Sequence, residues 1–97
     1  MLTGTYLCTT LLRGRERHAT IRLDERPGGA LDASFTALKQ TFRARGACDG
    51  DAFVFEGRLR VLLKVFDYRV QGSVAGDELM AAVRLGDHEL LVRGVRQ

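Results

Sequence analysis

Two pairs of neighbouring residues could supply an acid and a base for catalysis. Asp67 precedes Tyr68, and His88 precedes Glu89. Both pairs fall in segments that alternate as strands do, and neighbouring side chains of a strand point to opposite faces. The members of a pair therefore cannot act together. Since GxSxG, P-loop and dinucleotide motifs are also missing, a reaction would rely on substrate positioning by tyrosines or cysteines, and the sequence names no catalytic residue.

The cysteines and histidines do not have the spacing of a metal site. Cys8 and Cys48 form no CxxC motif, and we expect them to be free thiols on strands that are not neighbours. His18 and His88 lie far from a second ligand, at turns or strand starts where side chains are exposed. We therefore expect neither a bound metal nor a cofactor.

The charge of the chain is modest and spread along the sequence. There are 15 basic and 12 acidic residues, and all the basic ones except Lys39 and Lys64 are arginines. Such a large share of arginine suits phosphate recognition, and a gene of biased base composition would also produce it. The one dense group comprises Arg13, Arg15 and Arg17. Because nucleic-acid binders gather basic residues on one face, we do not expect nucleic acid as a partner.

The chain of 97 residues predicts a single domain, residues 1–97. It has no apolar run near the ~20 residues of a membrane helix. The first residues also lack the basic and apolar regions of a signal peptide. We expect a cytoplasmic protein with no membrane partner.

Alternation with period two runs through the chain and predicts an all-β fold. Turn signals fall at residues 13–17, 26–29, 49–51, 75–78 and 86–87. Between them the expected strands lie near residues 2–12, 18–24, 31–37, 40–47, 53–58, 64–73, 79–83 and 90–94. Eight short antiparallel strands in an up-and-down meander close most economically as a small β-barrel. A helix over residues 33–45 is the alternative there, because Phe35, Leu38 and Phe42 also have helical spacing.

One segment breaks the alternation. Residues 59–65 place adjacent leucines on opposite faces, which predicts a bulge or a loop at the barrel mouth. The segment is either a covered hairpin or an apolar surface, serving as an entrance lip or a contact for a partner.

The two ends of the chain carry a pattern of their own. Gly4-x-Tyr6 opens the first strand, and Arg96 follows Gly94 at the end of the last. This resembles the calycin pattern of lipocalins and fatty-acid-binding proteins, with Tyr6 in place of the usual tryptophan. In those families a Gly-x-Trp packs beside an arginine of the last strand. The resemblance implies a calycin-like barrel whose floor is closed by Gly4, Tyr6 and Arg96.

A barrel of this size can hold one small ligand, and the inward positions are rich in aromatic residues. We expect binding of a small hydrophobic molecule, contacted by Tyr6, Phe35, Phe42, Phe53, Phe55, Phe66 and Tyr68. The resemblance also allows a cofactor-independent cyclase or isomerase of a hydrophobic natural-product intermediate, as small bacterial barrels can be. A filled barrel that acts as a protein-interaction module is the third possibility. The sequence does not decide whether the protein is an enzyme.

The outward positions of the first and last two strands are also apolar. In a closed barrel these strands are neighbours, so their side chains form one surface. We expect a two-fold homodimer through Leu7, Leu11, Met80, Leu91 and Val95.

Overall fold

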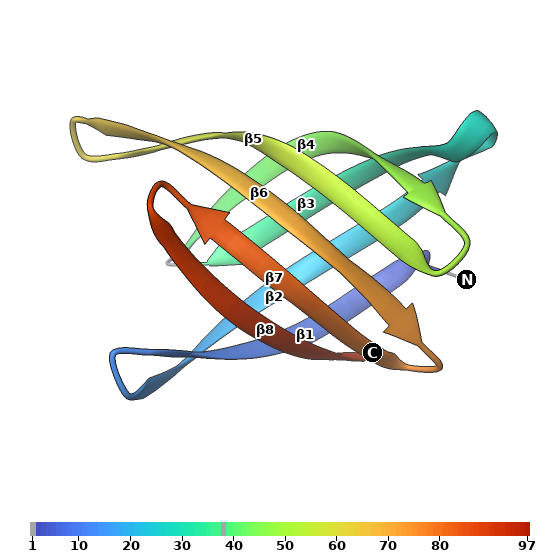
Figure 1. Cartoon of the computed structure of the whole chain (residues 1–97), viewed down its shortest axis with the longest axis horizontal. Coiled ribbons are helices and arrows are strands. Elements are labelled where there is room, and N and C mark those ends of the chain that lie inside the picture. Colours follow the sequence, from blue (N-terminus) through green and yellow to red (C-terminus); the bar gives the residue numbers. More distant parts are fainter. Residues whose placement is uncertain (1, 38) are drawn as a thin grey trace.

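The structure is a computed structural model that describes residues 2–37 and 39–97. Each strand pairs antiparallel with the next along the chain, and β8 pairs with β1 to close a barrel (Figure 1). The predicted all-β, up-and-down fold of eight strands is therefore confirmed. The strands are β1 (Gly4–Leu12), β2 (Arg15–Arg26), β3 (Ala30–Ala37), β4 (Gln40–Asp49), β5 (Ala52–Val61), β6 (Lys64–Ala75), β7 (Glu78–Leu85) and β8 (His88–Arg96).

Apolar and polar residues alternate along the strands because one face packs inside the barrel and the other meets solvent. In β2, for example, Ile21 and Leu23 are buried and Arg22 is exposed. The helix considered for residues 33–45 is wrong, since residues 33–37 belong to β3 and residues 40–45 to β4. Phe35 pairs with Phe42 across this hairpin, which accounts for their spacing without a helix. No helix in the two described ranges is long and apolar enough to cross a membrane.

Several strands are longer than predicted because their turns are shorter. The predicted turn at residues 13–17 reduces to Arg13 and Gly14, whose φ angles are 53° and 76°. Two residues with positive φ suit the twist of a tight hairpin, so pairing begins at once on either side. His18 consequently lies inside β2 rather than at its start. The segment Pro27–Gly29, between β2 and β3, is a short 3-10 turn, η1.

The segment at residues 59–65 contains another two-residue turn, formed by Leu62 and Leu63 between β5 and β6. Leu62 has a φ of 57°, close to the values of 60°, 62° and 59° at Gly50, Gly76 and Gly86, the first residues of three other turns. The two leucines are 90% and 99% exposed. The segment is thus a loop at the barrel end, as one prediction held, and the covered hairpin is wrong.

The two ends of the barrel differ. We call the end that holds both chain termini the floor and the opposite end the mouth (Figure 1). The hairpin turns that follow β1, β3, β5 and β7 lie at the mouth. Following the pairing register once around the barrel returns to β1 displaced by about ten residues, against eight in the filled TIM barrel. A larger displacement means more tilted strands and therefore a wider interior.

The wall is interrupted at the mouth between β4 and β5. The ladder between these strands ends at the pair Arg45 and Glu56. Beyond it, residues 40–44 of β4 and 57–61 of β5 continue without a ladder partner across the gap, and the two strands diverge toward the mouth (Figure 1). We call this gap the open seam.

Candidate functional site

The floor is closed by residues from both ends of the chain. The Arg96 guanidinium lies 5.1 Å from the centre of the Tyr6 ring, where a cation is attracted to the aromatic face. Its Nη1 donates to the carbonyl of Thr3 at 2.5 Å, and its Nη2 donates to that of Gly76 at 3.3 Å. A Cβ at Gly4 would come within 2.8 Å of the same Nη1, so the glycine makes room for the arginine. Arg96 thus ties β8 to the segment before β1 and to the turn after β6.

The Tyr6 hydroxyl is used within the protein. It donates to the carbonyl of Leu2 at 2.6 Å, and both residues are fully buried. Burial is the main cause that raises the pKa of Tyr6, with the Arg96 charge acting in the opposite direction. Tyr6 is therefore a neutral, satisfied part of the floor, with its hydrogen-bonding proton committed to the chain.

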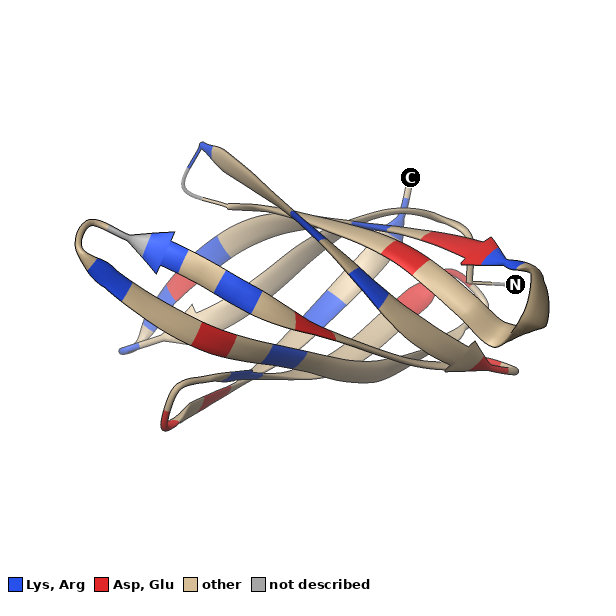
Figure 2. Ribbon diagram, turned by 90° about the horizontal axis from the view of Figure 1, so that it is seen from above, with Lys and Arg blue, Asp and Glu red and all other residues tan. Residues whose placement is uncertain are grey.

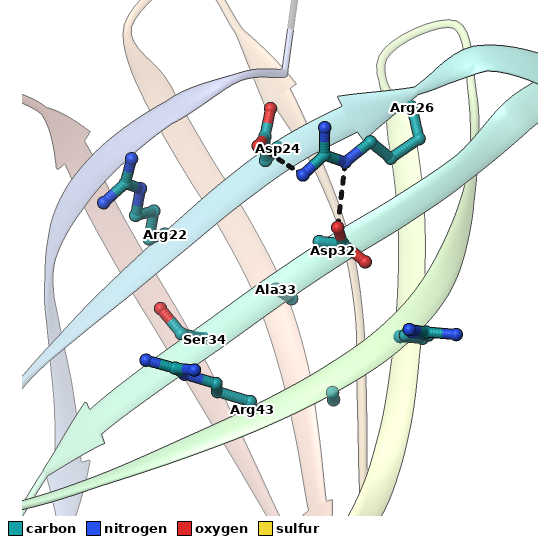
Figure 3. A pocket seen from close by; sticks show the side chains of 9 residues that line it. Arg22, Asp24, Arg26, Asp32, Ala33, Ser34 and Arg43 are labelled. Carbon is teal, nitrogen blue, oxygen red and sulfur yellow. Dashed lines mark hydrogen bonds and ion pairs between the residues drawn. The ribbon is translucent and has the colours of Figure 1, made fainter.

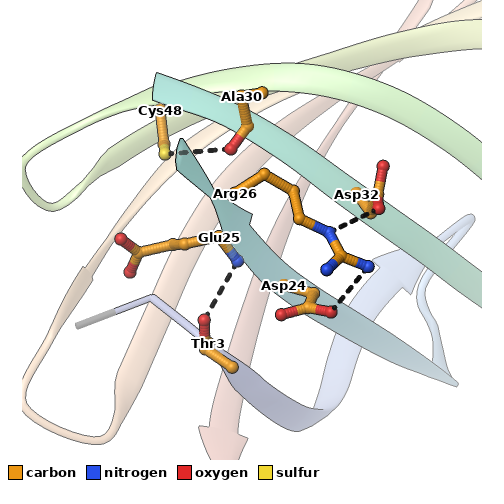
Figure 4. Close-up of polar contacts among 7 residues, drawn as sticks. All are labelled: Thr3, Asp24, Glu25, Arg26, Ala30, Asp32 and Cys48. Carbon is orange, nitrogen blue, oxygen red and sulfur yellow. Dashed lines mark hydrogen bonds and ion pairs between the residues drawn. The ribbon is translucent and has the colours of Figure 1, made fainter. Parts of the chain in front are cut away.

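Further polar contacts seal the same end (Figure 4). The Glu25 amide donates to Thr3 Oγ1 at 3.0 Å, and the Leu2 amide donates to the Glu25 carboxylate. On the next hairpin the Cys48 thiol lies 3.7 Å from the carbonyl of Ala30. The two hydrogen bonds to Glu25 fix the segment before β1 against β2, so Leu2 is held at the closed end of the barrel.

The aromatic residues predicted to contact a ligand separate into levels. Tyr6 belongs to the floor. Phe53, Phe55 and Tyr68 are also buried, and Phe53 lies at the floor end of β5; the ring centres are 6.2 Å apart for Phe53 and Phe55 and 6.4 Å for Phe55 and Tyr68. The remaining three are only half-buried, lie toward the mouth, and comprise Phe35, Phe42 and Phe66, the first two with ring centres 6.0 Å apart. The interior is thus most tightly buried at the floor and least so at the mouth.

The Tyr68 hydroxyl differs from that of Tyr6 because no described residue forms a hydrogen bond with it. The side chain is 5% exposed, yet its oxygen is not sealed, since a fully enclosed polar atom without a partner occurs nowhere in the described ranges. The phenol lies over Gly57, where a Cβ would come within 2.8 Å of the hydroxyl oxygen. Gly57 directly follows Glu56, where the ladder between β4 and β5 ends, so the hydroxyl lies beside the open seam. Desolvation raises the pKa of Tyr68, which keeps the phenol neutral.

The other candidate nucleophiles and bases are unsuited to catalysis. Cys8 is 1% exposed, and burial raises the pKa of its thiol to about 11. Such a thiol is protonated at neutral pH and is a poor nucleophile. Asp67 is exposed whereas Tyr68 is buried, so this pair is divided between the two faces. Within residues 2–37 and 39–97, no three His, Cys, Asp or Glu side chains are grouped closely enough to hold a metal ion.

A basic hollow lies on the outside, over β2, β3 and β4, and sequence analysis did not predict it (Figure 3). The register places Arg22 opposite Ser34 and Ser34 opposite Arg43, so two arginines far apart in the sequence flank one hydroxyl. Neither arginine forms an ion pair with an acidic side chain of the described residues. Only knowledge of the register could have brought these residues together.

The neighbouring part of the hollow is neutralised. Arg26 lies 3.4 Å from Asp24 and 2.8 Å from Asp32, as the dashed lines in Figure 3 show. Arg22 and Arg43 are both exposed, and their charges are screened by solvent. The hollow could attract an anion, but no buried polar group of the described residues is directed into it.

Comparisons with known proteins found no family model, no curated protein and no solved structure that matches this chain.

Proposed function

We propose that the barrel binds a small, mostly apolar molecule that carries one polar group, in the upper part of its interior. The Tyr68 hydroxyl is the observation that carries this proposal. This hydroxyl has no hydrogen-bond partner among the described residues and its oxygen is not sealed, so the polar group of a ligand can reach it and form the bond. The surrounding wall is aromatic, as ligand pockets with few, well-placed polar groups are.

The open seam and the mouth supply a route to this position. Residues 40–44 and 57–61 have no ladder between them, so the wall can widen there without breaking strand pairing. Phe42 stands on one side of the seam and Gly57 on the other, with the Tyr68 phenol behind the glycine. A flat or flexible apolar molecule could pass between them and stack against Phe42.

Two further features support a calycin-like barrel as the scaffold. Gly4, Tyr6 and Arg96 lie together at the floor, where the resemblance expects them. The strand stagger of about ten residues also favours a wider bore than that of a filled eight-stranded core. No pair of described residues favours the cyclase or isomerase alternative.

Native mass spectrometry of freshly purified protein, followed by denaturing extraction, tests the proposal. We expect a co-purifying small molecule on the wild type. Rebinding of the extracted molecule should weaken at least tenfold in Tyr68→Phe, because the hydrogen bond is lost. Gln71→Ala, on the outer wall and outside the proposed dimer surface, is the control and should bind as the wild type does. A bare wild-type chain, or equal binding by Tyr68→Phe, would contradict the proposal.

We also propose that the protein is cytoplasmic and forms a two-fold homodimer through the outer faces of β1, β7 and β8. Leu7 is paired with Val95 across β1 and β8, and the two are 52% and 53% exposed. Leu11, Met80 and Leu91 extend the same surface at 68%, 49% and 74% exposure. Light scattering that finds a monomer at high concentration would rule the dimer out.

A further inference from the structure

The turn between β5 and β6 differs from the three turns made of glycine and aspartate. Gly50, Gly76 and Gly86 each occupy the left-handed first position of a turn and are each followed by aspartate. In this turn Leu62 takes the glycine position and Leu63 the aspartate position. A leucine with positive φ is strained, and two leucines left 90% and 99% exposed contribute nothing to the core. Strain retained without benefit to folding points to a function outside the fold.

A second hairpin at the mouth has the same character. Leu11 and Leu12, at the end of β1, are 68% and 40% exposed and are followed directly by Arg13. The β1–β2 and β5–β6 hairpins reach farthest from the barrel at this end (Figure 1). A flat surface placed against the mouth would therefore meet both tips together.

The mouth is basic and the floor is acidic. Among the described residues at the mouth, Glu16, Asp87 and Glu89 oppose a larger set of exposed basic residues, none of which is ion-paired with a described residue. This set is Arg13, Arg15, Arg17, Lys39, Arg60 and Lys64. At the floor the acidic residues outnumber Arg26 and Arg96, and they are Glu25, Asp49, Asp51, Asp77 and Glu78. Figure 2 shows several blue segments toward the mouth, where one hairpin tip is red, and red segments at the opposite end, with blue beside the C-terminus.

We propose that the mouth docks on the surface of a bilayer that contains anionic phospholipid. Leu62 and Leu63 enter the boundary between headgroups and acyl chains, and the basic residues of the tips contact lipid phosphates. Binding of nucleic acid would not require the exposed leucines. The hairpin tips project separately, and this arrangement fits a flat bilayer surface better than it fits one contiguous patch on a partner protein. The sequence excluded a membrane partner because it has no spanning segment, and surface contact needs none.

Vesicle flotation tests the docking. Phosphatidylcholine vesicles with one third phosphatidylglycerol should carry the wild-type protein, and vesicles of phosphatidylcholine alone should not. The double variant Leu62→Gly, Leu63→Asp copies the three glycine–aspartate turns, so it should fold at least as well and bind at least tenfold more weakly. Arg60→Gln with Lys64→Gln should lose about fivefold for each charge removed. Arg69→Gln with Arg93→Gln removes the same charge from the middle of the barrel wall and should change nothing.

A tryptophan reporter locates the contact, since the chain contains no tryptophan. Leu63→Trp should shift its emission to the blue with anionic vesicles, whereas Gln71→Trp on the exposed face of β6 should not. Flotation that fails, that ignores lipid charge, or that survives the turn replacement overturns the proposal, as does a mouth that captures only proteins. Docking does not require a bound ligand, so Tyr68→Phe should float as the wild type does. That variant separates failure of docking from failure of ligand binding.

Discussion

The two tyrosines should respond in opposite ways to the same substitution. Each Tyr→Phe change removes one hydroxyl and leaves the ring in place. In Tyr6→Phe the loss breaks a 2.6 Å bond and leaves the buried carbonyl of Leu2 without its donor. We expect a loss of about 1–3 kcal/mol in the free energy of unfolding. In Tyr68→Phe no internal bond is lost, and a desolvated hydroxyl is removed. Its stability should equal that of the wild type or exceed it by up to about 1 kcal/mol.

Urea unfolding followed by far-ultraviolet circular dichroism measures both variants without relying on tyrosine emission. The protein should first be extracted and refolded, because a ligand that binds only the folded state would stabilise the wild type selectively. If Tyr68→Phe loses as much stability as Tyr6→Phe, its hydroxyl has a partner inside the protein. The reasoning that makes it a contact for a ligand would then be refuted.

Three further predictions follow from the floor, the buried thiol and the close approach of two strands. Arg96→Ala should lose about 2–3 kcal/mol of stability, because it removes the stacking on Tyr6, two side-chain hydrogen bonds and the ion pair with Asp77. The exposed Arg93→Ala should stay within about 0.5 kcal/mol in urea unfolding, and equal losses would show that Arg96 does not hold the floor together. Because burial raises the pKa of Cys8 from 9.0 to about 11, the unfolded chain releases this proton first, so stability should hold up to pH 9 and then fall by about 2 kcal/mol by pH 11. The decline in stability between pH 9 and 10, where the tyrosines contribute least, should be flatter in Cys8→Ala and unchanged in Cys48→Ala, whose thiol is half-buried. An unchanged decline in Cys8→Ala would mean that another group causes it. Gly46→Ala would place a Cβ 1.9 Å from a carbonyl oxygen of β5, so we expect a loss above about 3 kcal/mol or no folded protein, and a wild-type melting temperature would show that the strands can separate there.

The barrel itself was predictable because apolar and polar residues alternate along each strand, and this alternation indicates which side chains face inward. Phe53 and Phe55, for instance, alternate with Val54 and Glu56, and the first pair is buried. The turns were predictable where glycine and aspartate formed them. The prediction was least definite at Leu62 and Leu63, because leucine is atypical of a tight turn and broke the alternation.

The site was less predictable because it depends on where ladders end. Nothing in the composition of β4 or β5 indicates that pairing stops at Arg45 and Glu56. The state of the Tyr68 hydroxyl also depends on neighbours from other strands, whereas its sequence neighbours resemble those of other buried residues. The row of Arg22, Ser34 and Arg43 likewise exists only through register, since along the chain these arginines are dispersed.

The open seam also determines how the barrel fluctuates. At the floor every strand is paired with both of its neighbours, and Arg96 connects the last strand to the segment before the first. At the mouth the wall is a curled sheet with two free margins, so its thermal motion is a flexing of those margins. Local opening of this kind costs a fraction of the global unfolding free energy. The mouth end of the interior can therefore widen and narrow while the floor stays rigid. Amide hydrogen exchange should accordingly be slow around Tyr6 and fast around Gly57.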